Sequence, residues 1–289
     1  MEISMKRFYI MPNHLKDVDL KVATMVREEL YRCDPGVEVV VEENIEERSS
    51  GRITAETECI IVLGGDGTMI RAANDIVGLG IPLIGINLGT LGYLTEIERN
   101  NIPDAMRRLV SDDYHMEERM MLAGVVDCKG VGAEVAGIEE ISALNDVVLT
   151  RHGDFQIIGY RVSVNGKYLN DFYADGMILS TPTGSSGYNL SAGGSIVEPK
   201  ARLIVLTPVC PHTMSTRSII LSPEDKIEIE VLPPRGEKPV EVEACFDGTG
   251  QGILHPGDRV TVFRSSQVTK IIKLSDVGFL EVLHKKLSV

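Results

Sequence analysis

Two glycine- and hydroxyl-rich segments, each directly after a short apolar run, are the parts of this sequence best suited to chemistry. The first, Gly64-Gly65-Asp66-Gly67-Thr68, follows Ile60–Leu63, and the second, Ser180–Tyr188, follows Met177–Leu179. Glycine lets backbone N–H groups approach phosphate oxygens, and a helix N-terminus after such a turn adds positive potential. The two segments therefore indicate one site for a phosphorylated ligand, assembled from distant parts of the chain.

The acid in the first turn, Asp66, needs its own explanation, because a carboxylate does not help to bind phosphate. In a functional interpretation the amides of Gly65 and Gly67 hold phosphate oxygens while Asp66 faces an attacking hydroxyl as a general base, within ~3 Å of the proton it takes. In a structural interpretation Asp66 caps a helix that starts near Met69, or supports the turn. Thr68 is the better candidate for the cap, which favours the functional interpretation. The turn has neither the GxGxxG spacing nor the P-loop Gly-Lys-Ser/Thr.

Three further polar residues interrupt apolar surroundings in the second half of the chain. Asn145 and Asp146 lie between Leu144 and Val147. Two polar side chains in a half-buried strand need partners, since an unpaired buried polar group costs about 1–3 kcal/mol. The vicinal hydroxyls of a ribose would satisfy them, and a bulge or strand-end turn is the alternative. Asp175 either accepts hydrogen bonds from a ribose or amide, or is a turn residue before a strand.

The second glycine-rich segment offers hydroxyls next to an expected helix start. These are Thr183, Ser185, Ser186 and Ser191. Tyr188 supplies a ring for stacking on a flat base, or packs ordinarily. Arg71 and Arg217 are either phosphate-binding cations or solvated surface residues. As a unit, the segment is far more specific than its members.

Composition restricts the class of protein. The chain has 289 residues, 43% of them hydrophobic, which is enough for a buried core and indicates two domains. The net charge of −13 argues against nonspecific nucleic-acid or anionic-membrane binding. No apolar stretch approaches the ~18 residues of a membrane span, and the start lacks a signal-peptide core, so we expect a cytoplasmic protein. The cysteines form no CxxC pair and His212 has no neighbour at metal-ligand spacing, so no residue is assigned as a metal ligand.

The first third alternates short, uniformly apolar strands with helices. This pattern predicts an α/β domain, a parallel sheet with helices on both faces, over residues 1–116. The expected strands are Arg7–Met11, Val37–Val41, Cys59–Leu63 and Ile81–Ile86, and the expected helices are Lys16–Tyr31, Met69–Val77 and Ile102–Val110.

From residue 117 to 275 the pattern predicts a β-rich domain with little helix. The expected strands are Met120–Cys128, Ala143–Arg151, Tyr160–Val164, Gly176–Ser180, Ile204–Pro208, Ile227–Leu232, Val240–Ala244, Asp258–Phe263 and Val268–Leu274. Asn165-Gly166 is the one good hairpin signal. Residues 276–289 form a tail, with a helix at Val277–Leu287, that we expect to pack back on the first domain.

Taken in order, these segments resemble the NAD kinase family. The first turn is similar to the family's GGDGT loop, and Asn87–Leu94 to its NLGxLGFL segment. Leu144–Val148 is similar to its N-(D/E) strand, Ala174–Ala192 to its ADG-(x)-STPTGSTAYSLSAGG stretch, and Thr207–His212 to its TPICPH segment. GGDGT alone is shared with lipid kinases and, in near form, with phosphofructokinases, so the longer stretch carries the resemblance.

The resemblance implies an N-terminal α/β domain and a β-rich C-terminal domain with NAD between them. Asp66 would be the base, or the group that orients the hydroxyl, acting on the adenosine 2′-OH, and Asn145 with Asp146 would hold the adenosine ribose. Tyr93 would close near the adenine. The remaining binding residues expected are Gly65, Gly67, Thr68, Arg71, Asp175, Thr183, Ser186, Gly187, Tyr188 and Ser191. The chain departs from the family at Ser186-Gly187, where Thr-Ala is usual, which should loosen the loop.

The implied activity is transfer of a phosphoryl group from ATP or polyphosphate to NAD, giving NADP. Mg²⁺ or another divalent cation would accompany the nucleotide donor, and a homodimer or homotetramer is expected. Two alternatives remain: a lipid or sugar kinase that shares only GGDGT, and a dinucleotide sensor without catalysis. The acidic chain supplies no membrane-facing surface for a lipid kinase, and Asp66 with Asn145 argues against a sensor.

Overall fold

The computed structural model describes residues 5–43, 53–89, 92–128, 140–153, 156–212, 217–236, 239–275 and 278–288. The chain forms two compact units, the first made of Met1–Glu118 with Thr269–Val289 and the second of Arg119–Val268. The divisions fall within strands β5 (His115–Asp127) and β16 (Arg259–Lys273), close to the expected boundary at residue 116 but before the one at residue 275. Thr90 and Leu91 of the NLGxLGFL-like segment, and Val277 at the start of the expected tail helix, lie outside the described residues.

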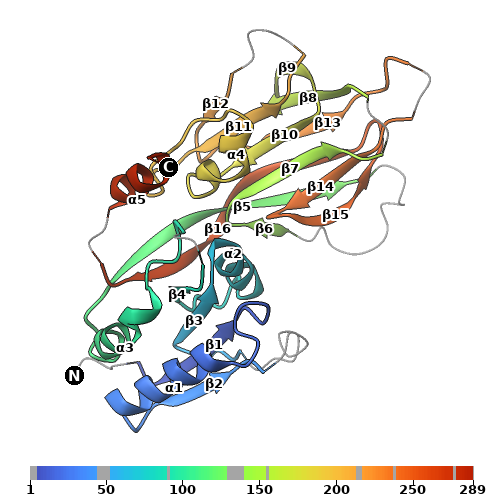
Figure 1. Cartoon of the computed structure of the whole chain (residues 1–289). Helices are drawn as coiled ribbons and strands as arrows, with labels where there is room; N and C mark the ends of the chain where they lie inside the picture. The colour runs from blue at the N-terminus through green and yellow to red at the C-terminus, as the bar shows by residue number, and fades with distance from the viewer. Residues whose placement is uncertain are drawn as a thin grey trace. The chain divides into compact units, whose positions relative to one another are not determined.

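A parallel sheet forms the centre of the first unit (Figure 1). Its order is β2-β1-β3-β4-β16, and every neighbouring pair is parallel. The strands are β1 (Arg7–Pro12), β2 (Glu38–Val41), β3 (Cys59–Gly64), β4 (Leu83–Asn87) and the last residues of β16. β3 and β4 are buried along their whole lengths, as expected for strands covered on both faces. The predicted α/β fold class is confirmed for this unit.

Helices cover the two faces of this sheet. Val26 of α1 (Lys21–Cys33) and Met106 of α3 (Ile102–Val110) share a buried cluster with Ile84 and Ile86 of β4. Gly85 points to the opposite face because strand residues alternate, and a side chain there would meet Met69 of α2 (Asp66–Asp75). α2 therefore packs on the face opposite to α1 and α3.

The first helix begins later than its apolar spacing indicates. Residues 13–20 form turns, and Val18, which lies inside the expected helix Lys16–Tyr31, is 74% exposed. The Asp17 carboxylate accepts hydrogen bonds from the backbone N–H groups of Val22 and Ala23, at 3.0 and 2.9 Å. Asp17 thus satisfies amides in the first turn of α1 and separates residues 13–20 as a loop at the carboxyl end of β1.

The second unit contains two antiparallel groups of strands, which confirms the predicted β-rich class. One sheet has the order β12-β11-β10-β7-β14-β15. In the other group the order is β16-β13-β8-β9, and β5 pairs with β16 and with β6. The first sheet contains β7 (Asp146–Arg151), β10 (Gly176–Ser180), β11 (Ile204–Val209), β12 (Ile219–Leu221), β14 (Val242–Phe246) and β15 (Thr249–Leu254). The others are β6 (Ile141–Ala143), β8 (Ile158–Val164), β9 (Lys167–Ala174) and β13 (Ile227–Val231).

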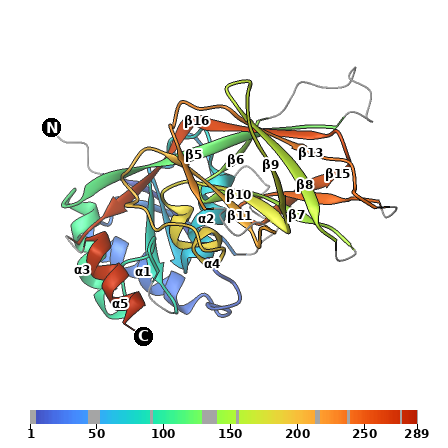
Figure 2. The same cartoon turned by 90° about the horizontal axis from the view of Figure 1, so that it is seen from above.

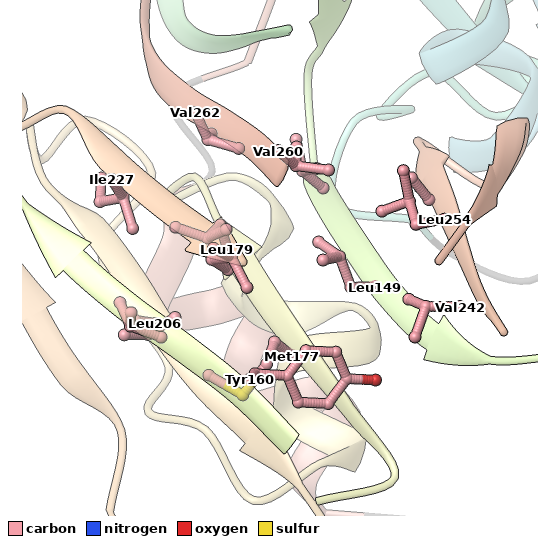
Figure 3. Packing of buried hydrophobic residues seen from close by; sticks show 14 of the residues in the cluster. Leu149, Tyr160, Met177, Leu179, Leu206, Ile227, Val242, Leu254, Val260 and Val262 are labelled. Atoms are coloured by element: carbon pink, nitrogen blue, oxygen red, sulfur yellow. The ribbon is translucent and has the colours of Figure 1, made fainter. Parts of the chain in front are cut away.

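The core of the second unit lies between these two groups. Tyr160 and Ile227 come from one group, and Leu149, Met177 and Leu206 come from the other (Figure 3). All five are fully buried. The apolar alternation along each strand therefore places one face of every sheet in a shared core.

Some strand and hairpin predictions in this unit are wrong in detail. The expected strands Asp258–Phe263 and Val268–Leu274 are one strand, β16. The expected strand Ala143–Arg151 is interrupted at residues 144–145, between β6 and β7. A second hairpin signal was missed: besides Asn165-Gly166 between β8 and β9, Asp247-Gly248 joins β14 to β15, and φ is positive at all four residues.

The C-terminal residues belong to the first unit. Helix α5 (Phe279–Leu287) places the Phe279 ring 6.0 Å from the Tyr93 ring, and Lys286 Nζ lies 4.3 Å from the centre of the same ring. At the end of β16, the Glu96 carboxylate accepts a hydrogen bond from the Leu274 N–H at 2.6 Å. None of the helices in the described ranges has the length and apolar character of a membrane span.

Candidate functional site

In the first unit Asp66 is the first residue of α2, and its carboxylate is bound to backbone amides. Oδ2 accepts a hydrogen bond from the Tyr93 N–H at 2.8 Å, and Oδ1 accepts one from the Leu94 N–H at 2.9 Å. The expectation that Thr68 caps this helix is wrong: no side chain in the described part of the chain caps α2, and the Thr68 hydroxyl accepts a hydrogen bond from Asn13 Nδ2. Each carboxylate oxygen keeps a further lone pair, so Asp66 can still accept a substrate hydroxyl proton.

The close approach of Asp66 to the segment after β4 depends on a glycine. A Cβ atom at Gly92 would overlap Asp66 Oδ1 and would lie 2.7 Å from Thr95 Oγ1. Thr95 is 1% exposed, and its hydroxyl has no hydrogen-bond partner among the described residues. Sequence reasoning missed Gly92 and Thr95, because their importance comes from the pairing of β3 with β4.

The other expected residues of the first unit differ in exposure. Gly65 is half-buried at the N-cap of α2, Gly67 is exposed, and Thr68 is buried. Arg71 lies exposed on α2. The ring of Tyr93 is half-buried and contacts α5.

In the second unit Asn145 lies in the break between β6 and β7. The Asp247 carboxylate accepts hydrogen bonds from the backbone N–H groups of Leu144, Asn145 and Asp146 at 2.6, 2.8 and 3.0 Å. These amides are therefore satisfied without a strand partner, which is why the predicted strand is interrupted. Sequence reasoning missed Asp247, although the dipeptide Asp247-Gly248 is a hairpin signal.

The second glycine-rich segment packs directly on Asn145. The Thr181 N–H donates to the Asn145 carbonyl at 2.8 Å, and a Cβ atom at Gly184 would overlap the same carbonyl oxygen. Asn145 Oδ1 and Thr183 Oγ1 are buried without a hydrogen-bond partner among the described residues. An unsatisfied buried polar atom costs about 1–3 kcal/mol, so a ligand that donates to these oxygens would remove a cost.

Two residues of this segment hold the loop itself. Ser185 Oγ donates to the Pro182 carbonyl at 2.7 Å and accepts from the Val197 N–H at 2.9 Å. Asn189, fully buried, donates to the Ser185 carbonyl at 3.1 Å and accepts from the Thr207 hydroxyl at 2.7 Å. The Ser185 hydroxyl is therefore structural, and Asn189 is a positioning residue that sequence reasoning missed.

The remaining expected residues lie around this loop and the start of β10. Gly184–Ser186 is a 3₁₀ turn and Tyr188–Ser191 is the short helix α4, which lies against β10 (Figure 2). Ser186 and Gly187 are half-buried, whereas Tyr188 and Ser191 are exposed. Asp175, just before β10, forms an ion pair with Arg151 at 3.0 Å, so one of its oxygens already has a partner.

The electrostatics of Asp146 are unusual. Its residue is 7% exposed, and burial together with the negative charge of Asp247 raises the pKa of the Asp146 carboxyl from 3.8 to about 7. Both effects disfavour the ionised form. Asp146 is therefore poised to change its charge near neutral pH.

Comparison with known proteins identifies the family. Residues 50–114 match the ATP-NAD kinase N-terminal domain, and residues 144–274 match the ATP-NAD kinase C-terminal domain. The chain is 42% identical over 288 residues to the NAD kinase of Agathobacter rectalis, covering 98% of this chain and 99% of the relative. The chain belongs to the NAD kinase family. The NAD kinase of Lachnoclostridium phytofermentans is 40% identical over 286 residues, with 98% of this chain and 99% of the relative covered.

Two solved structures confirm the NAD kinase fold. The crystal structure of yeast NADH kinase complexed with NADH has a TM-score of 0.88 at 24% identity, covering 99% of this chain and 88% of the yeast chain. The structure of an NAD kinase from Archaeoglobus fulgidus in complex with ATP has a TM-score of 0.74 at 23% identity, covering 98% and 99% of the two chains.

Substitution Gly92→Ala should lower kcat of the NAD kinase by about 100-fold, because the new methyl group displaces the Asp66 carboxylate and a shift of about 1 Å can cost that much. Steady-state kinetics and thermal unfolding test this. Gly236→Ala is the matched control, because a Cβ atom there meets no atom within 4 Å. A Gly92→Ala enzyme with nearly normal kcat would show that the carboxylate need not occupy this position.

The raised pKa of Asp146 predicts how stability changes with pH. Between about pH 4 and pH 7 the folded chain binds a proton at Asp146 that the unfolded chain releases, so this contribution to stability is present at low pH and is lost as pH rises through about 7. The free energy of unfolding of Asp146→Asn, relative to that of wild type, should therefore increase by roughly 1–4 kcal/mol from pH 5 to pH 8.

Thermal unfolding of both proteins at the two pH values measures this difference. The control is Asp127→Asn, at an exposed position, which should shift little between the two pH values. A difference between wild type and Asp146→Asn that stays constant from pH 5 to pH 8 would contradict the assigned titration.

Proposed function

We propose that this enzyme transfers a phosphoryl group from ATP, or from inorganic polyphosphate, to the 2′-hydroxyl of the adenosine ribose of NAD and so produces NADP. The observation that carries the proposal is the Asp66 carboxylate, fixed by two backbone N–H groups at the start of α2 in a chain of the NAD kinase family. The family match covers both units rather than the GGDGT turn alone, which favours NAD over a lipid or sugar as acceptor.

Asp66 is proposed as the general base. The N–H groups of Tyr93 and Leu94 orient its carboxylate, while the remaining lone pairs are available to the attacking hydroxyl. As the oxygen attacks phosphorus, its proton passes to Asp66 and the bond from phosphorus to the donor's bridging oxygen breaks. Phosphoryl transfer depends mainly on such positioning and on neutralising charge.

The donor phosphates are proposed to bind at the N-terminus of α2. The amides of Asp66 and Gly67 lie in its first turn, where N–H groups have no partner within the helix. Thr68 has its hydroxyl fixed by Asn13, and Arg71 lies further along the same helix. The Archaeoglobus fulgidus relative, whose structure is described as a complex with ATP, supports ATP as donor.

The acceptor ribose is proposed to bind at Asn145 and Asp146. Asn145 Oδ1 needs a donor, and an ionised Asp146 accepts hydrogen bonds from hydroxyl groups. The yeast NADH kinase complexed with NADH supports a dinucleotide ligand. Further contacts are proposed for Tyr93, Asp175, Thr183, Ser186, Gly187, Tyr188 and Ser191.

Mg²⁺ is proposed to enter with the donor as part of that substrate. No group of three or more His, Cys, Asp or Glu residues that could hold a metal ion occurs in the described ranges. Mg²⁺ commonly keeps its waters and binds through substrate phosphates with one or two carboxylates, which fits this residue set. From the family resemblance we also propose a homo-oligomer, a dimer or tetramer, in the cytoplasm.

Purified enzyme with NAD, Mg²⁺ and either ATP or polyphosphate should produce NADP, detected by an NADP-specific dehydrogenase. Comparing the two donors at equal phosphoryl concentration shows which one is used. Binding of NAD with no NADP from either donor would instead support a dinucleotide sensor.

Replacement of Asp66 by Asn should lower kcat by about 10²–10⁴-fold, the usual contribution of a general base, with little change in the dissociation constant for NAD. The amide also places N–H where a carboxylate oxygen accepts backbone N–H groups, so thermal unfolding must be measured beside kcat. A variant that keeps more than about a tenth of the wild-type kcat would rule out the base role.

A further inference from the structure

We propose that Lys16, in the loop between β1 and α1, binds the phosphate chain of the phosphoryl donor. The inference rests on the proposed function and extends it by naming the cation of the donor site. The sequence predicts Lys16 at the start of a helix, and the cations that it offers for phosphate are Arg71 and Arg217. In the structure Lys16 lies in the turns before α1.

The side chain of Lys16 lies against the backbone of Gly65 and Gly89, at the carboxyl ends of β3 and β4. A Cβ atom at Gly89, after β4, would be 2.9 Å from Lys16 Nζ, and one at Gly65, after β3, would be 3.9 Å from it. The ammonium group is therefore next to the backbone of the turn that starts α2. A phosphate bound at the α2 N-terminus would lie within reach of Lys16 Nζ.

The backbone that carries Lys16 is fixed to the same turn. Asn13 N–H donates to the Leu63 carbonyl at 2.7 Å, and Asn13 Nδ2 donates to Thr68 Oγ1 at 3.1 Å. The Lys16 N–H donates to the Asn13 carbonyl at 2.9 Å. The loop thus holds the root of the lysine side chain at a defined distance from the residues of the GGDGT turn.

Within the part of the chain that the structure describes, the charge of Lys16 is not offset by a carboxylate, unlike that of two lysines near it in the sequence. Lys6 pairs with Asp34, and Lys21 pairs with Asp19 at 2.9 Å. Lys16 has no ion pair among the described residues. A phosphate chain would supply the missing anion.

The overall charge of the chain makes such a cation important. With a net charge of −13, the enzyme repels a polyanionic donor at long range, and a local positive group beside the donor phosphates offsets part of this repulsion. Lysine suits the task because its compact ammonium group has three donors on a flexible stem, which can follow phosphate oxygens during transfer. Backbone amides alone supply direction but no net charge.

The test compares Lys16→Gln and Lys16→Arg with wild type. Lys16→Gln should raise KM for ATP about 10- to 100-fold, the usual effect of losing a charged hydrogen bond, while KM for NAD stays near the wild-type value. Lys16→Arg should restore most of the affinity, because it keeps the charge. Lys21→Gln is the matched control, since this neighbouring lysine has an exposed side chain and a carboxylate partner.

Calorimetric binding of ATP with Mg²⁺ should give the same ranking, and the difference between wild type and Lys16→Gln should shrink with added salt. An unchanged KM and affinity for ATP in Lys16→Gln would overturn the proposal. Equal losses for ATP and NAD, with a lower melting temperature and no rescue by Arg, would also overturn it in favour of a structural role. If wild type makes no NADP from either donor, the proposed function fails, and the ATP affinities still decide the role of Lys16.

Discussion

Two hydrogen bonds, from the backbone N–H groups of Tyr93 and Leu94 to the Asp66 carboxylate, are the constraint on which the first unit's site depends. They connect the start of α2 to the segment after β4, and they orient the carboxylate through backbone groups alone. Parallel pairing of β3 and β4 brings the two segments to the same edge of the sheet. The glycine at position 92 then lets backbone and carboxylate approach to hydrogen-bonding distance.

In the second unit, too, a carboxylate accepts hydrogen bonds from backbone amides. Asp247 holds three consecutive amides at residues 144–146, and Gly184 lets the hydroxyl-rich loop pack on the carbonyl of Asn145. This arrangement has an electrostatic cost, because it places the buried Asp146 near a second carboxylate and raises its pKa to about 7. In both units a carboxylate organises backbone and a glycine provides the space.

Much of this could be predicted from sequence where the signal is local. The fully apolar runs gave β3 and β4, and the helix Ile102–Val110 has the predicted bounds. The hydrogen bonds from backbone amides to Asp66 and Asp247 could not be predicted, because only strand pairing brings those amides near the two carboxylates. The position of Lys16 in a loop could not be predicted either, because the apolar spacing of residues 16–31 is typical of a helix. In the structure Asp17 accepts hydrogen bonds from the first turn of α1, which begins at Lys21. The family resemblance named binding residues but not what supports them.

The packing of α5 on Tyr93 makes the surroundings of this ring depend on the C-terminal residues. Phe279 and Lys286 of α5 both contact the ring of Tyr93, the residue expected to lie near the adenine. A deletion that removes α5 takes away both contacts and exposes more of the Tyr93 ring, although the turns at Gly64–Thr68 and Ser180–Tyr188 keep their sequence.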